Sequence, residues 1–338
     1  MFKWLRTKAG QKDEASAAVV ALRPRSAEAV LRRMEWTVLR RLDGLLQGDY
    51  RTLFRGQGLD LADLREYQYG DDVRHIDWNV TARLQTPYVR EYHEDREIGA
   101  WFLLDLSPSV DFGSHDVRKR AVSENFVAVL GRLLTRHGNR VGAMLYGSGV
   151  EAVIPPGSGR RHVLGILHAM GAPRSQAAPA GRRTDLSDLL RAAAHMIHRR
   201  SLVFVVSDFF SEPGWERLLG TLAQRHEIIA VRLYDPLESE LPDLGLVPFR
   251  DAETGEQVLV DTHDPAFRAR FAAAAARREA ALRTGFARSA VDVLELSTED
   301  DLVDAVVRFT DLRKRRSRVA GSAPLARGAR MSERGAAA

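Results

Sequence analysis

Short apolar runs alternate with longer amphipathic segments along the chain from residue 98 onward. Runs that are rich in β-branched and aromatic residues and bounded by polar turns predict strands at 98–104, 140–146, 151–154, 202–206, 227–233 and 291–295. Apolar residues at helical spacing predict helices at 117–137, 160–170, 185–199, 214–225, 265–286 and 298–311. Because such alternation is typical of a mostly parallel sheet with helices on both faces, we predict a doubly wound α/β fold.

One pair of predicted strands departs from this alternation. The runs at 140–146 and 151–154 are joined only by Gly147, Ser148 and Gly149, a connection too short for a crossover helix. We therefore expect a hairpin, which adds one antiparallel strand to the otherwise parallel sheet.

The regions before and after the alternating part have a different pattern. Apolar positions at helical spacing predict a helix from Ser26, its N-cap, to Gln47, whereas the strongly polar residues after it predict an extended, loop-rich segment. We expect four parts: an N-terminal polar segment and helix at 1–50, an extended segment at 51–97, the α/β domain at 98–312 and a basic, disordered tail at 313–338.

Composition limits the class of protein. The chain has 338 residues, is 45% hydrophobic and 28% charged, and contains no cysteine. The absence of cysteine excludes disulfides, thiolate catalysis and cysteine-based zinc sites. No apolar stretch reaches the roughly 18 residues of a membrane span, and the first residues are too charged for a secretory signal, so we expect a cytoplasmic protein.

The net charge of +5 is concentrated at the C-terminus. Eight Lys or Arg residues against one Glu give residues 313–338 a net charge of +7, and subtraction from the total leaves −2 for residues 1–312. A basic run of this kind can contact nucleic acid or an anionic membrane surface. Because no aromatic residues are interleaved for base stacking, we expect no nucleic-acid partner, and peripheral membrane contact through the tail stays open.

Oxygen-bearing side chains follow two of the predicted core strands and precede one predicted helix. In chain order they are Asp105, Ser107, Ser109, Thr184 and Asp208. Since ligands of α/β proteins bind at the carboxyl edge of the sheet, we expect these groups to converge there. Carboxylate and hydroxyl oxygens suit Mg²⁺, or alternatively Mn²⁺ or Ca²⁺, and five protein ligands leave at least one position open for a carboxylate from a partner.

Simpler and enzymatic interpretations of the same residues also exist. Ser107 followed by Pro108 is a common helix start, and Asp105 can cap the same helix. A haloacid-dehalogenase-type phosphotransferase usually has a second Asp where this chain has Ser107, and a serine hydrolase has a G-x-S-x-G elbow, which the sequence lacks. Metal-assisted hydrolysis of phosphoester or ester substrates stays open as an alternative.

Taken together, the oxygen-bearing stretches resemble a known metal site. The Asp-x-Ser-x-Ser at 105–109, the Thr-Asp at 184–185 and the Ser-Asp at 207–208 are similar to the metal-ion-dependent adhesion site of von Willebrand factor A domains, which have a Rossmann-like sheet. The chain departs from that pattern at Arg182-Arg183, where a Gly pair is often found. The resemblance implies five metal-site positions: Asp105, Ser107, Ser109, Thr184 and Asp208.

The polar segment carries a second resemblance. The stretch from Arg65 to Trp78, followed by Ala82-Arg83 and by Tyr88 to Glu91, resembles the signature of the bacterial domain of unknown function 58 family. The resemblance implies an A-domain-like protein that works with a MoxR-type AAA+ ATPase. The charged residues of this stretch form either a partner-binding face or an internal salt-bridged network with Trp78 as its apolar anchor, and we favour the network.

These observations lead to one functional hypothesis. We expect a non-enzymatic, metal-dependent protein-interaction adaptor whose Mg²⁺ engages an acidic residue of a partner, with a MoxR-type AAA+ ATPase as the leading candidate. Its role would lie in the maturation or assembly of protein complexes, with Asp105 and Asp208 as the essential anions. The alternative is a metal-dependent hydrolase.

Overall fold

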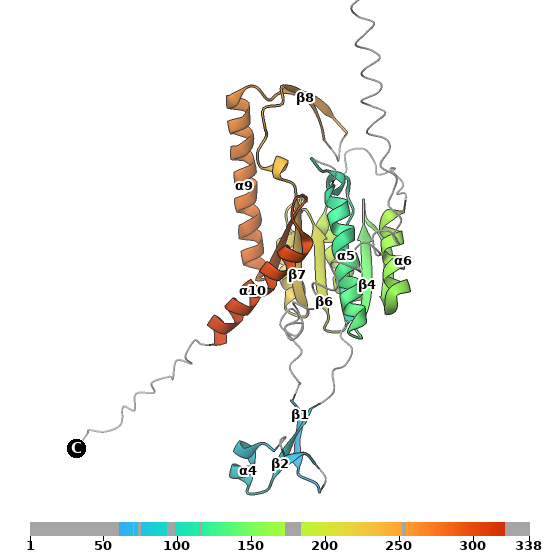
Figure 1. The fold of residues 1–338 in the computed structure, drawn as a ribbon, viewed down its shortest axis with the longest axis vertical. Helices are drawn as coiled ribbons and strands as arrows, with labels where there is room; N and C mark the ends of the chain where they lie inside the picture. The colour runs from blue at the N-terminus through green and yellow to red at the C-terminus, as the bar shows by residue number, and fades with distance from the viewer. Residues whose placement is uncertain are drawn as a thin grey trace, which may run out of the picture.

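The computed structural model describes residues 61–69, 71–73, 76–92, 99–114, 117–172, 184–251 and 255–321. This part of the chain contains ten β-strands and seven α-helices (Figure 1). The predicted N-terminal helix from Ser26 to Gln47 lies outside it, as do the residues after Gly321. Among the described residues, every helix falls short of the length or the apolarity that a membrane crossing requires.

A six-stranded sheet forms the centre of the molecule, with the strand order β10-β7-β6-β3-β4-β5. Every neighbouring pair is parallel except β4 and β5, which form the predicted antiparallel hairpin at one edge. The strands are β3 (Gly99–Asp105), β4 (Arg140–Tyr146), β5 (Val150–Gly157), β6 (Leu202–Ser207), β7 (Glu227–Tyr234) and β10 (Asp292–Ser297).

Helices cover both faces of this sheet, which confirms the doubly wound α/β prediction. Side chains of β3 alternate between two apolar cores: Phe102 and Leu104 belong to one, and Trp101 and Leu103 to the other. The first core contains α5 (Lys119–Arg136), α6 (Gly159–Gly171) and α10 (Leu302–Gly321), and the second contains α7 (Leu186–Met196), α8 (Trp215–Ala223) and α9 (Pro265–Ser289).

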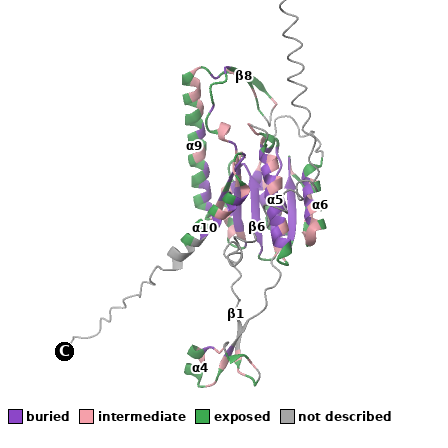
Figure 2. Cartoon of the chain, in the orientation of Figure 1, coloured by how far each residue is buried: buried purple, intermediate pink, exposed green. Residues whose placement is uncertain are grey.

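Burial on both sides explains why the central strands read as continuous apolar runs. All six residues of β6 are buried, and Figure 2 shows the central strands in the colour of buried residues. The ring of Phe102 on β3 stacks on Phe204 of β6 at 5.2 Å between centroids, and both contact Phe126 of α5. Parallel strands covered on two faces have no polar face to alternate with, so their sequence is apolar throughout.

The basic tail begins later than predicted. Helix α10 continues to Gly321, so the expectation of disorder from residue 313 is wrong for residues 313–321. Arg313 is only 7% exposed, and its guanidinium lies 2.7 Å from carboxylate oxygens of both Glu227 and Asp292. The first residue of the basic run therefore belongs to the folded domain.

The polar segment before the sheet is more ordered than predicted. Strands β1 (Leu61–Glu66) and β2 (Tyr88–Tyr92) form an antiparallel pair, and α4 (Trp78–Leu84) lies between them in the chain with Asp77 as its N-cap. Arg65 forms two hydrogen bonds of 2.8 Å with Asp71, which lies six residues further along the same segment. The predicted role of the charged network, to hold this segment against the sheet, stays a prediction. Trp78 is 69% exposed, so its predicted role as an apolar anchor is wrong.

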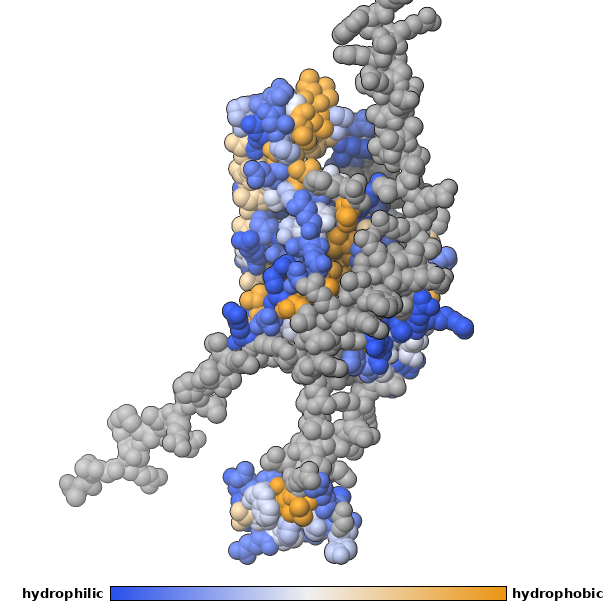
Figure 3. Space-filling model, in the orientation of Figure 1, coloured by the Kyte–Doolittle hydropathy of each residue, from blue (hydrophilic) through white to orange (hydrophobic). Residues whose placement is uncertain are grey.

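A second hairpin was not predicted. Strands β8 (Leu246–Arg250) and β9 (Gln257–Asp261) pair antiparallel in a two-stranded sheet of their own. Leu246 and Leu259 are more than half exposed, and Figure 3 shows apolar surface at this end of the molecule. A run of five residues that contains Pro248 lacks the length and the burial by which the core strands were found.

Candidate functional site

The carboxyl end of β3 presents the first predicted site residues. Asp105 ends the strand and is completely buried, and the chain then enters the 3₁₀ helix η2 (Pro108–Asp111). Asp105 Oδ1 accepts the N–H of Ser107 at 3.0 Å, and the hydroxyl oxygens of Ser107 and Ser109 lie 3.2 Å apart. Ser107 is the N-cap residue of η2, as the simpler interpretation proposed, but its side chain makes no capping hydrogen bond.

Asp208 reaches the same edge from β6. Immediately after it, Phe209 has a φ of 58°, a left-handed conformation that is strained for a bulky residue. The Phe209 ring packs against Trp215 and Phe286, with centroid distances of 5.0 and 4.8 Å. This packing holds the turn, and Asp208 Oδ1 accepts the N–H of Phe210 at 3.0 Å within it.

One hydrogen bond ties the two strand ends together. Ser207 Oγ donates to Asp105 Oδ2 at 2.6 Å and accepts the N–H of Phe209 at 2.8 Å. Burial and the charge of the nearby Asp208 raise the pKa of Asp105 to about 6. The structure therefore gathers four of the five predicted residues at the carboxyl edge: Asp105, Ser107, Ser109 and Asp208.

Thr184 approaches this edge from another side. It is buried, and its backbone carbonyl accepts the N–H of Glu212, in the loop that follows β6, at 3.0 Å. The hydroxyl of Tyr146, which is paired with Asp105 across β4 and β3, accepts the N–H of Asp185 at 3.3 Å. These contacts place Thr184 beside the site, while the preceding Arg182-Arg183 pair lies outside the described residues.

A buried lysine that the sequence analysis did not identify lies among these groups. Lys119 is the first residue of α5 and is 1% exposed. Its Nζ lies 2.6 Å from Asp208 Oδ2 and 2.5 Å from Glu238 Oε1, under the rings of Phe112 and Phe210. Burial alone would lower the pKa of Lys119, but the two carboxylates outweigh it and raise the pKa, so the side chain is an ammonium.

Glu238 is held over Lys119 by a second buried carboxylate. Asp235 and Glu238 form a reciprocal capping box around the short 3₁₀ helix η3 (Pro236–Glu238). Asp235 also accepts the N–H and the hydroxyl of Ser114 at 2.9 Å and the hydroxyl of Thr298 at 2.8 Å. Burial raises the pKa of Asp235, but these hydrogen bonds more than offset it, and the pKa is lowered. The charged Asp235 thus ties three loops together at this edge.

The donor set does not fit a divalent cation in this arrangement. Asp208 Oδ2 is bonded to the ammonium of Lys119, and the other oxygens of Asp105 and Asp208 each accept an N–H or O–H. A dication at the same carboxylate would be repelled by that buried ammonium. Within the described ranges, no group of three or more Asp, Glu or His side chains is arranged to hold a metal ion. Mg²⁺ at the five predicted ligands would require Lys119 to leave Asp208, and the metal site stays a prediction.

The sequence contained a signal for Lys119. The buried positions of α5 recur every three or four residues through Val122, Phe126 and Leu130, and Lys119 falls on the same stripe. Lysine is almost never fully buried without a partner, so a lysine on the core face of a helix indicates an internal ion pair. The partner had no such signal, because Glu238 lies in an irregular connection after β7.

An open pocket of about 540 Å³ adjoins the edge. Thr184, the loop after β6 and Arg278 of α9 line it. The Arg278 guanidinium stacks on the Phe210 ring at 4.1 Å and donates to the backbone carbonyl of Glu238 at 3.1 Å. An arginine on an aromatic ring beside a concave surface is a combination that protein interfaces favour.

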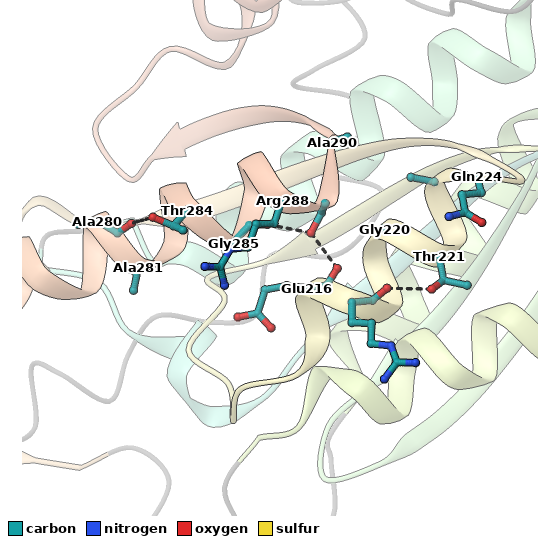
Figure 4. Close-up of a pocket in the computed structure, with 13 residues that line it drawn as sticks. Glu216, Gly220, Thr221, Gln224, Ala280, Ala281, Thr284, Gly285, Arg288 and Ala290 are labelled. Atoms are coloured by element: carbon teal, nitrogen blue, oxygen red, sulfur yellow. Dashed lines mark hydrogen bonds between the residues drawn. The ribbon is translucent and has the colours of Figure 1, made fainter.

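A larger groove, of about 1020 Å³, lies between α8 and α9 (Figure 4). Its walls consist largely of small residues such as Gly220 and Ala280. Gly285 permits this close approach, because a Cβ there would lie only 2.9 Å from Cγ of Glu216, and Ser289 Oγ donates to the Glu216 carbonyl at 2.8 Å. The groove is a product of helix packing, and the predicted site residues lie elsewhere.

Sequence comparisons identify relatives of this chain. The family described as Protein of unknown function DUF58 matches residues 63–281. An uncharacterized protein of Mycobacterium tuberculosis (strain ATCC 25618 / H37Rv) is 38% identical over 287 residues, which cover 85% of this chain and 90% of the relative. An uncharacterized protein of Mycobacterium avium is 37% identical over 163 residues, which cover 48% of this chain and 94% of the relative.

Solved structures give more distant likenesses. An aerotolerance-related membrane protein of Bacteroides fragilis NCTC 9343 superposes with a TM-score of 0.42 at 11% identity, covering 65% of this chain and 99% of that one. An uncharacterized membrane spanning protein of Vibrio fischeri gives a TM-score of 0.24 at 15% identity, covering 66% and 98%. Both are described as membrane proteins, in contrast to the expectation of a cytoplasmic protein, and that expectation is withdrawn.

Proposed function

The chain belongs to the family described as Protein of unknown function DUF58, and from this premise we propose that it is a non-enzymatic adaptor that presents the carboxyl edge of its sheet to a protein partner. The observation that carries this proposal is the convergence of Asp105, Ser107, Ser109 and Asp208 on that edge, beside an open pocket. Ligands of doubly wound proteins bind at this edge.

We also propose that the α/β domain built around the six-stranded sheet is von Willebrand factor A-like. The Asp-x-Ser-x-Ser loop follows β3, the Ser-Asp pair follows β6, and the two strands are neighbours in a sheet with one antiparallel edge strand. These features support the assignment because the metal-ion-dependent adhesion site of von Willebrand factor A domains is formed by the loops after the corresponding strands. In such a domain the edge engages another protein.

The outer surface of the edge has the chemistry of a protein interface. Phe112 is 41% exposed and Val117 is 38% exposed, and both lie in the connection between η2 and α5. Phe210 and Arg278 belong to the same surface, because the rings of Phe112 and Phe210 lie 5.8 and 5.1 Å from the same Lys119 Nζ. Aromatic and arginine side chains of this kind carry most of the binding energy in typical interfaces.

The proposed partner is a MoxR-type AAA+ ATPase, and the proposed role is the maturation or assembly of protein complexes. The support for this partner is the resemblance of the segment from Arg65 to Trp78 to a family whose members are often encoded beside such an ATPase. Because Asp208 is bonded to the Lys119 ammonium, the proposed contact with the ATPase is made without a Mg²⁺ ion.

A binding titration with the purified MoxR-type ATPase of the same organism tests the proposal. Phe112→Ser should weaken binding by about tenfold or more, because removal of a central aromatic residue typically costs about 2 kcal/mol. The matched control is Leu312→Ser on α10, which removes an exposed apolar side chain away from this edge and should leave the affinity unchanged. Equal affinity of the wild type and Phe112→Ser, or no binding by the wild type, refutes the proposal.

A further inference from the structure

Three separate elements aim charged side chains at one buried point of the carboxyl edge. Lys119 comes from the start of α5, Asp208 from the end of β6 and Glu238 from η3. The side chains of Lys119 and Asp208 are 1% and 0% exposed, and that of Glu238 is 13% exposed. A cluster so enclosed persists only if its charges satisfy one another, since each ion has lost its water.

The Lys119 ammonium makes the hydrogen bonds and aromatic contacts that a permanently buried cation needs. Lys119 Nζ donates to Asp208 at 2.6 Å and to Glu238 at 2.5 Å, and the rings of Phe112 and Phe210 cover it. Contacts between a cation and aromatic faces become stronger where water is excluded. A lysine ammonium is a compact point charge, and it can therefore stand where a small metal ion would stand.

The neighbouring oxygens are those that the adhesion-site pattern assigns to a metal. Asp208 bonds the ammonium directly, and Asp105 is linked to the same strand end through Ser207. The hydroxyls of Ser107 and Ser109 lie on the adjoining loop. The Lys119 ammonium thus bonds Asp208, the carboxylate that a metal ion at this edge would also need as a ligand.

We propose that the Lys119 ammonium is the resident cation of the carboxyl edge, in the place that a divalent metal takes in the adhesion-site pattern, and that the edge is metal-independent in the wild-type protein. Removal of the lysine leaves Asp208 and Glu238 without their cation, next to Asp105. In that variant, the oxygens of Asp208 and Glu238 that Lys119 bonds become available to a hard dication, which prefers oxygen ligands. Loss of Lys119 therefore creates metal affinity.

Titration of the full chain with Mn²⁺, followed by electron paramagnetic resonance and calorimetry, tests this inference. The wild type is expected to show no saturable binding and the same Tm in EDTA as in Mg²⁺. Lys119→Ala is expected to bind Mn²⁺ saturably, with a Tm that rises with Mn²⁺ concentration because the ion binds only the folded state. The double variant Lys119→Ala/Asp208→Asn is expected to lose this response.

A second variant covers the case in which Lys119→Ala does not fold. Lys119→Arg keeps a cation beside Asp208 and Glu238, and its Tm is expected to stay independent of Mg²⁺. Saturable Mn²⁺ binding by the wild type that Asp208→Asn abolishes overturns the inference, as does a folded Lys119→Ala protein that binds no Mn²⁺. The wild-type titration needs no variant, so the inference is decided in either case.

The inference deepens the proposed function but is tested apart from it. Metal binding is measured on the protein alone, so absence of an ATPase partner leaves its outcome unchanged. If both hold, binding of the ATPase to the wild type is expected to be the same in EDTA and in Mg²⁺. Loss of that binding in EDTA contradicts the resident ammonium while leaving the adaptor function intact.

Discussion

Two buried cations lie at opposite edges of the central sheet, and each bridges two carboxylates. At the carboxyl edge, Lys119 joins Asp208 and Glu238. At the amino edge, Arg313 of α10 joins the first residues of β7 and β10. Both cations also lie near an aromatic ring. The two clusters therefore have the same arrangement of one cation, two carboxylates and an aromatic ring. Their differences indicate which cluster has a functional role in addition to stabilising the fold.

The clusters differ in their access to water and in the groups around them. The partners of Arg313 are 18% and 29% exposed, whereas those of Lys119 are 0% and 13% exposed. Near Asp208 there is also a further buried carboxylate, Asp105, whose pKa is raised to about 6 by burial and by Asp208. Packing alone does not require that additional charge. Such an excess of buried charge is typical of functional sites. We therefore interpret the amino-edge cluster as a structural ion-pair cluster and the carboxyl-edge cluster as a functional site.

The largest expected effect is that of Lys119→Met, which keeps the length of the side chain and removes its charge. Asp208 and Glu238 then lose their shared cation in a place that water does not reach. Breaking a buried pair in this way typically costs about 3–5 kcal/mol of the free energy of unfolding. Denaturation by urea in the presence of EDTA measures this loss. A loss below about 1 kcal/mol would show that the ammonium is not bonded as described.

Arg313→Met is the matched change at the amino edge, and we expect a smaller effect. Glu227 and Asp292 are partly exposed, so water can replace the lost guanidinium, and the free energy of unfolding should fall by about 2 kcal/mol. The same urea denaturation measures it. This variant should bind no Mn²⁺ and should keep the affinity of the wild type for the ATPase. A greater loss than that of Lys119→Met would reverse the comparison between the two edges.

The parts of the molecule that local patterns govern could be predicted from the sequence. The apolar runs gave the central strands β3, β4 and β6 because both of their faces are buried, and the predicted strand at 140–146 coincides with β4. The proximity of Asp105 and Asp208 could be predicted because the carboxyl ends of neighbouring parallel strands lie at the same edge of the sheet. Helix α4 was missed because it begins at Trp78 within a polar segment and has no buried residue.

The ionic cluster at the carboxyl edge could not be predicted in the same way. Lys119 is separated from Asp208 by 89 positions in the chain and from Glu238 by 119 positions. No spacing rule links such residues, because only the folded sheet brings α5, β6 and η3 together. The stripe of buried positions on α5 indicated that Lys119 needs a partner, but the identity of that partner depends on the three-dimensional arrangement.

The smallest expected effect, and the one of opposite sign, is that of Asp105→Asn. Because the pKa of Asp105 rises from 3.8 to about 6 on folding, the folded protein binds this proton more tightly than the unfolded chain. Wild-type stability therefore falls as the pH rises through this range. The amide carries no charge, its oxygen can still accept the N–H of Ser107, and its NH2 can donate to Ser207 Oγ in place of the hydrogen bond that Ser207 donates in the wild type. Near neutral pH the variant should therefore be more stable by about 1 kcal/mol. Urea denaturation at pH values below and above this range measures the difference, with Asp208→Asn, which should be destabilised, as the control. If Asp105→Asn is also destabilised at neutral pH, the Asp105 carboxylate supports the fold, and the two edges differ less than we infer.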